Sequence, residues 1–198
     1  LRKCKNIKEI LNDKQLLGLK FYDDILARIP RGEIIEHEKI LKKVLKKVDS
    51  RAELTIAGSY RRGKSESGDI DVLLKSKDKK TYNKFIDELV KIKYLYPEHL
   101  ALGPKKYNGL AIIPSCIIHR RIDIMYTREE EYPFAILYFT GSMEFNAKMR
   151  GLALEKGLSM NEYSLKDSNT KKVIDHKFNV EKDIFDYLGM DWVEPVDR

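Results

Sequence analysis

The sequence of 198 residues predicts an α+β fold: a mixed β-sheet with helices on one face, a short helical segment before it and a small α/β part after it. Residues 33–48 repeat apolar side chains at helical spacing, which is typical of one long amphipathic helix. Residues 69–74 and 117–126 alternate apolar and polar side chains, which is typical of strands. The elements follow one another in a βαβαββ-like order, and this order favours a mixed sheet.

The remaining elements follow from the same two periodicities and from turn residues. Helices are predicted over residues 7–11, 16–26, 33–48, 81–92, 143–154 and 181–188, and a further helical segment begins at Pro133. Strands are predicted over residues 54–57, 69–74, 110–113 and 117–126, with the last two joined through Pro114 and Ser115. Because no segment approaches the ~20 apolar residues of a membrane-spanning helix, we expect no membrane partner.

The net charge of +7 is concentrated in the middle of the chain. Residues 28–129 hold 23 basic and 14 acidic residues, residues 1–27 hold 6 and 4, and residues 130–198 hold 9 and 13. A basic surface of this kind suits a polyanion such as nucleic acid. Four lysines within the long amphipathic helix are instead typical of its solvated face: Lys42, Lys43, Lys46 and Lys47.

The two cysteines, Cys4 and Cys116, have neither the spacing of metal ligands nor that of a disulfide framework. A reducing compartment is therefore the simpler expectation. The first residues lack both a methionine and the apolar stretch of a secretory signal. We expect an intracellular protein whose chain has been processed or truncated.

Three aspartates are the strongest functional signal. Asp69 and Asp71 point to the same side of one predicted strand, because successive side chains alternate faces. Asp123 lies in a second alternating run, between Ile122 and Ile124. Neighbouring strands of this kind bring three carboxylates together, and close carboxylates repel each other. Hard divalent cations relieve this repulsion and suit phosphate chemistry, so the sequence predicts a metal site.

A turn into a helix is predicted at Gly58 and Ser59, directly after a strand. Glycine allows close backbone approach to a ligand, and Ser59 is expected to cap the helix, whose N-terminus favours an anion. Arg62 adds a charged donor for phosphate oxygens. An ordinary N-cap explains Ser59 alone equally well, but the combination with Arg62 and the aspartates favours a bound triphosphate.

Five motifs occur in a fixed order along the chain. They are GSYRRG at residues 58–63, GDIDVL at 68–73, HRRIDI at 119–124, LYFTGS at 137–142 and EKDIFDY at 181–187. With these motifs the chain resembles the family X DNA polymerases over residues 18–198, and within that family the beta type first and the lambda type next. The family's amino-terminal lyase domain has no counterpart among the matching residues, nor does the glycine-rich hairpin of its helix-hairpin-helix region.

The resemblance implies a nucleotidyltransferase palm and a division into three parts. Residues 1–27 would end the helical DNA-binding subdomain, residues 28–129 form the catalytic palm, and residues 130–198 form the subdomain that binds the nascent base pair. It also implies template-directed addition of dNTPs to a primer 3′-hydroxyl, for short-gap filling in DNA repair. Two Mg²⁺ ions are implied, with Mn²⁺ as a substitute. The partners would be primer-template or gapped DNA and a dNTP, and the protein a monomer in the nucleus or a viral replication compartment.

Site residues are carried over from the matching motifs. Asp69 and Asp71 would ligate both metals, and Asp123 only the metal at the primer hydroxyl. The set expected to bind the nucleotide is Arg28, Gly58, Ser59, Arg62, Ser67, Gly68, Tyr138, Phe139, Thr140, Gly141 and Asn146. The set expected to act on DNA is Lys106, Arg121, Arg150, Glu162 and Tyr163, of which the last two would support the closed form. From the residues alone, a pair such as Tyr138 and Phe139 is equally typical of a core.

Three positions depart from the family pattern. Met125 replaces an arginine that holds a metal-binding aspartate in the open form of the beta type, and Met143 and Ala147 replace an aspartate and a lysine near the base pair. We expect these changes to alter fidelity and not the reaction. Template-free members carry a long loop where residues 102–110 are short, and a tryptophan in place of the pair 138–139. Templated synthesis is therefore favoured over a terminal transferase, an RNA-directed nucleotidyltransferase or a catalytically silent DNA-binding module.

Overall fold

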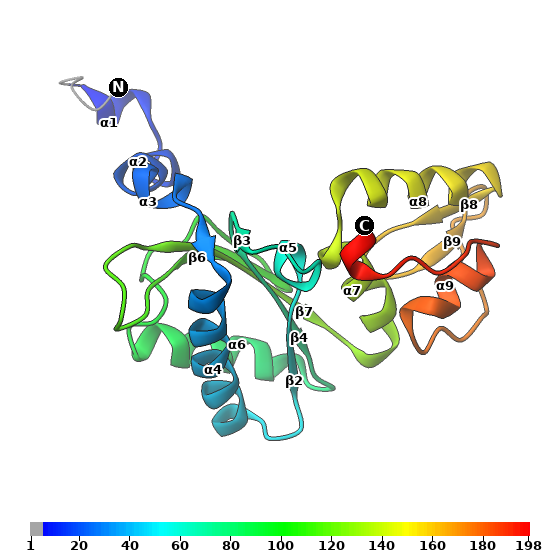
Figure 1. The fold of residues 1–198 in the computed structure, drawn as a ribbon, viewed down its shortest axis with the longest axis horizontal. Coiled ribbons are helices and arrows are strands. Elements are labelled where there is room, and N and C mark those ends of the chain that lie inside the picture. Colours follow the sequence, from blue (N-terminus) through cyan, green and yellow to red (C-terminus); the bar gives the residue numbers. More distant parts are fainter. Residues whose placement is uncertain (1–5) are drawn as a thin grey trace.

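The computed structural model describes residues 6–198 and has three parts in a row (Figure 1). Short helices lie at one end, a β-sheet with two long helices forms the middle, and a smaller α/β part ends the chain. The expectations for residues 1–5, including Cys4, lie outside the described residues. Within residues 6–198, no helix is both long enough and apolar enough to cross a bilayer.

A five-stranded mixed sheet forms the middle part, as predicted. In sheet order its strands are β2 (Glu53–Ile56), β4 (Ile70–Lys75), β7 (Arg120–Thr127), β6 (Lys106–Ala111) and β5 (Ala101–Leu102). Strands β4 and β7 are parallel, and the other neighbours are antiparallel. Two further strands, β1 (Ile29–Pro30) and β3 (Glu66–Ser67), pair with each other beside the sheet.

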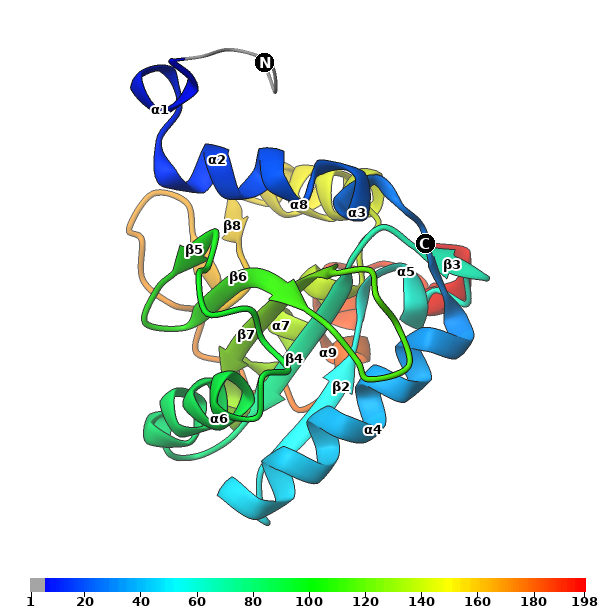
Figure 2. The ribbon, with the colours of Figure 1, turned by 90° about the vertical axis from the view of Figure 1, so that its left-hand side faces the viewer.

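Two long helices, α4 (Arg31–Val48) and α6 (Lys79–Lys91), cover one face of this sheet (Figure 2). Their apolar stripes bury the strand residues that alternate inward, among them Ile70, Val72 and Leu74, each fully buried. Burial of such side chains contributes about 1.5–3 kcal/mol each, which holds helices and sheet together. The strand residues between them, including Asp71, consequently face the other side of the sheet.

The expectation of helices on one face only is wrong. Helix α7 (Tyr132–Thr140) packs on the opposite face, where Ala135 and Ile136 contact Leu73 and Met125. Met125 is fully buried in this contact. The helix is apolar on all sides, as expected for an element buried between two layers.

The predicted strand boundaries around Pro114 need correction. Strand β6 begins at Lys106 and ends at Ala111, and β7 begins only at Arg120. The residues between them form a loop in which Ile117 is 91% exposed. Proline has no N–H for the sheet, which explains why the apolar run does not continue as a strand.

The C-terminal part has a core of its own. It comprises η1 (Glu129–Glu131), α7, α8 (Met143–Glu155), β8 (Leu158–Met160), β9 (Leu165–Asp167), α9 (Glu181–Tyr187) and η2 (Pro195–Asp197). Phe134, Phe145, Met149 and Phe185 are buried together there. A separate core explains how this part forms a distinct layer beside the sheet (Figure 1).

At the other end lie α1 (Ile7–Ile10), α2 (Asp13–Lys20) and α3 (Tyr22–Leu26), close to the helices predicted there. Asn12 and Gln15 form a reciprocal capping box that starts α2. Leu17 and Phe21 pack on Leu110 of β6, which fixes these helices to the sheet.

Candidate active site

The three aspartates meet at the neighbouring interior strands β4 and β7 of the sheet. The parallel register of β4 and β7 places Asp71 directly beside Asp123, and Asp69 lies just before β4. One carboxylate oxygen from each lies within 4.8 Å of the others, and among residues 6–198 these three side chains are the group that could hold a metal ion. The predicted convergence is therefore confirmed in geometry.

The electrostatics of this cluster favour a cation. Burial, followed by the charges of Asp69 and Asp123, raises the pKa of Asp71 to about 8. Burial also raises the pKa of Asp123, against the opposing effects of Asn108 and Arg121. Asp123 Oδ1 is buried, and no described residue donates a hydrogen bond to it. An orphaned carboxylate oxygen among close carboxylates fits divalent cations.

Arg121 supplies the nearest positive charge. Its Nη2 contacts Asp69 Oδ2 and lies 3.9 Å from Asp123 Oδ2. This residue, which was predicted to act on DNA, therefore lies among the carboxylates as their counter-ion. The side chain of Arg121 is 42% exposed, so it remains accessible to an incoming anion.

Gly58 is required by its contact with the metal cluster. Its φ is +55°, a conformation that favours glycine. A Cβ at this position would lie 1.9 Å from Asp71 Oδ2, which is a steric overlap. The backbone of Gly58 therefore packs directly against the Asp71 carboxylate, and no larger residue fits there.

The predicted helix cap at Ser59 is wrong. Helix α5 (Gly58–Arg61) has Ala57 at its N-cap without a side-chain bond, and Ser59 lies inside the helix. Ser59 Oγ instead donates to Ser67 Oγ at 2.8 Å, which joins the two predicted phosphate-binding segments. A helix of one turn offers little dipole, so side chains and loop backbone must supply most of any anion binding here.

Arg28 and Gly68 flank the same loop. Arg28 Nε donates to Glu66 Oε1 at 2.9 Å. A Cβ on Gly68 would lie 3.1 Å from Arg28 Nη1, so the arginine lies directly over the glycine. Arg28 thus lies at the predicted phosphate-binding loop, paired with a carboxylate in exposed surroundings.

Arg62 connects this loop to the end of α7. Its Nη1 donates to the carbonyl oxygen of Thr140 at 2.5 Å, and a Cβ on Gly141 would lie 3.0 Å from the same nitrogen. Arg61, which the sequence did not single out, donates to Thr140 Oγ1 at 2.6 Å and to Glu181. The adjacent arginines therefore join the predicted phosphate-binding loop to the end of α7, where residues 138–141 are predicted to bind the nucleotide.

The remaining nucleotide residues gather around Tyr138. Asn146 Nδ2 donates to the Tyr138 carbonyl oxygen at 2.8 Å, and the Arg150 guanidinium lies 5.4 Å from the Tyr138 ring centroid. Phe139 packs partly against the core under α7, as the alternative interpretation of this pair anticipated. Tyr138 remains half-buried.

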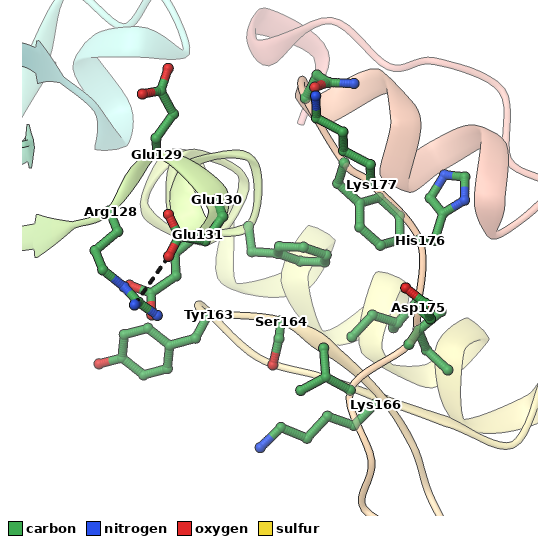
Figure 3. A pocket seen from close by; sticks show the side chains of 16 residues that line it. Arg128, Glu129, Glu130, Glu131, Tyr163, Ser164, Lys166, Asp175, His176 and Lys177 are labelled. Atoms are coloured by element: carbon green, nitrogen blue, oxygen red, sulfur yellow. Dashed lines mark hydrogen bonds and ion pairs between the residues drawn. The ribbon is translucent and has the colours of Figure 1, made fainter. Parts of the chain in front are cut away.

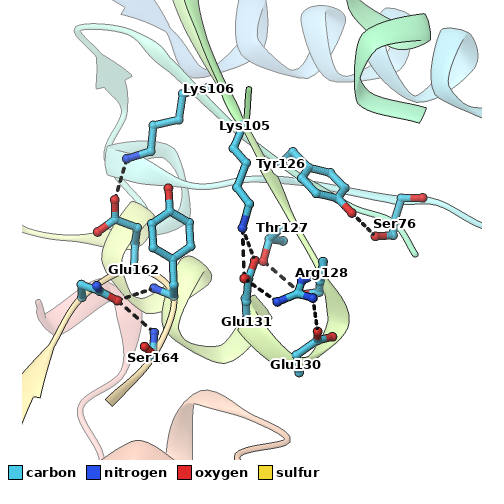
Figure 4. Close-up of polar contacts among 12 residues, drawn as sticks. Ser76, Lys105, Lys106, Tyr126, Thr127, Arg128, Glu130, Glu131, Glu162 and Ser164 are labelled. Carbon is cyan, nitrogen blue, oxygen red and sulfur yellow. Dashed lines mark hydrogen bonds and ion pairs between the residues drawn. The ribbon is translucent and has the colours of Figure 1, made fainter. Parts of the chain in front are cut away.

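Lys106 and Glu162 join the sheet to the C-terminal part (Figure 4), and the Tyr163 ring lies near Lys106. Lys106 Nζ lies 2.8 Å from Glu162 Oε1, and Lys105 Nζ lies 4.6 Å from the Tyr163 ring centroid. Lys105 also pairs with Glu131 at 2.9 Å. Residues predicted to act on DNA thus pair with one another in this conformation.

A separate cavity of about 770 Å³ lies in the C-terminal part (Figure 3). Arg128, Glu131 and His176 are among its lining residues, and Tyr163 is the one predicted site residue there. The cavity is lined by acidic, basic and apolar side chains. The three aspartates are not among its lining residues.

Sequence reasoning also missed Asn108. It lies directly opposite Asp123 in the antiparallel pair of β6 and β7, and its side-chain amide lowers the pKa of Asp123. A local motif gives no signal for it, because the predicted strand began two residues later, at Leu110.

Comparisons with known proteins agree with this geometry. Residues 28–129 match the family model described as DNA polymerase beta palm, and residues 135–198 match the model of the DNA polymerase beta thumb. The chain is 31% identical over 219 positions to DNA polymerase lambda of Arabidopsis thaliana, covering 100% of this chain and 41% of that protein.

Two further relatives extend the comparison. DNA polymerase lambda of Rattus norvegicus is 33% identical over 205 positions, covering 95% of this chain and 36% of the relative. DNA nucleotidylexotransferase of Xenopus laevis is 28% identical over 239 positions, covering 100% of this chain and 46% of the relative. The chain thus spans less than half the length of these relatives.

Proposed function

Because the chain belongs to the family X DNA polymerases, we propose that it adds deoxynucleotides to the 3′-hydroxyl of a primer under the direction of a template. The observation that carries the proposal is the convergence of Asp69, Asp71 and Asp123 beside a loop of phosphate-binding character. The two relatives named DNA polymerase lambda support the templated reaction.

We assign two divalent cations, Mg²⁺ with Mn²⁺ as a substitute, to the three aspartates. Asp69 and Asp71 serve both cations, and Asp123 serves the one at the primer hydroxyl. Bound cations supply charge neutralisation in phosphoryl transfer and ease deprotonation of the attacking hydroxyl. The support is the close carboxylate cluster with its orphaned, buried oxygen.

The nucleotide is proposed to lie between the loop at residues 58–68 and the end of α7. Ser59, Ser67, Gly68, Arg62 and Arg28 surround its phosphates. The segment from Tyr138 through Phe139 and Thr140 to Gly141 then lies at its sugar, and Asn146 at its base. The bond between Arg62 and Thr140 supports this arrangement, because it holds the two segments next to each other.

DNA is proposed to lie along Lys106, Arg121 and Arg150, with Glu162 and Tyr163 controlling how the thumb approaches it. We further propose a monomer that fills short gaps during DNA repair in the nucleus. The relatives reported above come from a plant, a rat and a frog, so they lend no support to a viral compartment. The division at residues 27/28 and 129/130 stays a prediction.

A template-free terminal transferase is the second candidate, and the frog relative favours it. The test is extension of a labelled primer with Mg²⁺ and dNTPs, with and without a template strand. We expect extension only with the template. Extension without it would favour the terminal transferase, and no extension under either condition would favour a catalytically silent DNA-binding module.

A further inference from the structure

We propose that Asn108 is a positioning residue for Asp123, whose carboxylate its side-chain amide holds in the orientation that binds a divalent cation. The inference rests on the proposed function, because it deepens the description of the same metal site. Nothing in the motifs around the aspartates points to this asparagine, which lies on a different strand.

The register of three neighbouring strands carries the argument. Asp71 on β4 lies beside Asp123 on β7, and Asp123 lies opposite Asn108 on β6. Directly opposed residues have Cβ atoms about 4.5–5.5 Å apart and share one face of the sheet. The neighbouring rows on the same face carry other residues on β6, with Leu110 opposite Arg121 and Lys106 opposite Met125. Among these three rows, only the aspartate row carries a neutral amide on β6.

The chemistry of an amide suits this position. Asn108 lies opposite Asp123 in the sheet and its amide lowers the pKa of that carboxyl, while Asp123 Oδ1 keeps no hydrogen-bond partner among the described residues. A neutral donor orients a carboxylate without neutralising it, whereas a lysine or arginine would compete with a cation for the charge. Arg121, the nearest cationic side chain to Asp123, is already shared with Asp69.

Asn108 is half-buried and lies outside the apolar clusters of the core. A substitution there should therefore leave the fold intact, which makes the role testable. Partners that orient metal ligands typically contribute 10–100-fold in metal affinity or activity.

The experiment compares Asn108→Val with Asn108→Thr, two side chains of similar shape of which only threonine retains a hydrogen-bond donor. Mn²⁺ binding is measured by electron paramagnetic resonance without turnover, and single-turnover rates are measured over a range of Mg²⁺ concentrations on primer-template. Asn83→Val, on the exposed face of α6, is the control for an asparagine far from the site.

We expect Asn108→Val to weaken Mn²⁺ binding by about 10-fold and to raise the half-saturating Mg²⁺ concentration equally. Asn108→Thr should stay within about 3-fold of wild type, and dNTP affinity should change little in either variant. Equal behaviour of the two variants, or wild-type Mn²⁺ binding by Asn108→Val, would overturn the role. If the wild type extends no primer, the proposed function fails, and the Mn²⁺ measurement still decides the role of Asn108.

Discussion

Lys106 Nζ lies 2.8 Å from Glu162 Oε1, and this ion pair joins the palm strand β6 to the loop between the thumb strands β8 and β9 (Figure 4). Lys106 also lies 5.4 Å from the ring centroid of Tyr138, at the proposed sugar site. A lysine proposed to contact DNA is thus held by the thumb, so DNA binding and thumb position should be coupled.

Lys106→Met should weaken binding to primer-template and reduce the slope of log K against log salt concentration by about 1, because one phosphate contact is lost. Glu162→Gln should leave that slope unchanged, since Lys106 keeps its charge. Fluorescence anisotropy over a range of salt concentrations measures both. Lys84→Met, exposed on α6, is the matched control. A wild-type slope in Lys106→Met would show that the lysine serves the thumb alone.

Gly58→Ala should abolish nucleotide addition, because the new Cβ would lie 1.9 Å from Asp71 Oδ2 and must displace that carboxylate. We expect single-turnover rates to fall by at least about 100-fold, on the scale lost when a preorganised charge is displaced. Gly32→Ala is the control, since its Cβ meets no atom within 4 Å and alanine favours helix α4. Activity of Gly58→Ala near that of Gly32→Ala would contradict the assigned place of Asp71.

Asp123→Ala should remove templated addition while leaving Mg²⁺-dependent dNTP binding largely intact, because Asp123 is assigned to the cation at the primer hydroxyl. A group that acts mainly in the transition state affects kcat more than binding. Single-turnover rates and dNTP Kd values measure the two effects separately. Residual turnover above roughly one-tenth of wild type, well short of the loss expected for such a group, would exclude this role.

Arg150→Ala should reduce insertion of the correct nucleotide more than incorrect insertion that forms a G·T mismatch. Minor-groove acceptors lie at equivalent places in correct pairs, so a donor there reports pairing geometry. Arg150 lies over Tyr138 on a half-buried face of α8, near the proposed nascent base pair. Lys148→Ala, exposed on the same helix, controls for a lost positive charge. Equal losses for matched and mismatched insertion would leave Arg150 as a DNA-binding charge only.

His37 should make the fold sensitive to acid. It is fully buried, Nδ1 lies 2.7 Å from Tyr94 Oη, and Glu33, Glu36 and Arg120 act on its charge. Burial lowers the pKa of His37 to about 4. Between that value and ~6.5 the unfolded chain binds more protons than the folded one, so stability falls as pH falls.

The wild type should therefore lose roughly 2–3 kcal/mol more unfolding free energy than His37→Gln between pH 7 and pH 4. Urea denaturation at each pH measures the difference in slope, which is independent of any offset that the substitution causes at pH 7. Parallel pH profiles would show that His37 keeps its ordinary pKa in the folded protein.

The sequence by itself predicted the main helices, the strands that carry the aspartates and the convergence of the three carboxylates. Apolar periodicity predicted α4, α6 and the strands that carry Asp71 and Asp123, and the α+β fold with its mixed sheet is confirmed. These signals are local, because a helix or strand must present its apolar residues to one side. Sequence reasoning failed around Pro114, where an apolar run forms a loop, and at Ser59, where the helix begins at Gly58, two residues earlier than a cap at Ser59 required.

Only the tertiary structure decided which residues meet. The register that places Asn108 opposite Asp123 depends on the pairing of β6 with β7 and leaves no local pattern. Arg61 and Glu181 are 120 residues apart in sequence, and Lys106 and Glu162 are 56 residues apart. Such contacts form only after the sheet and the thumb have packed on each other, because a charge in an unfolded chain has no preferred partner at that separation.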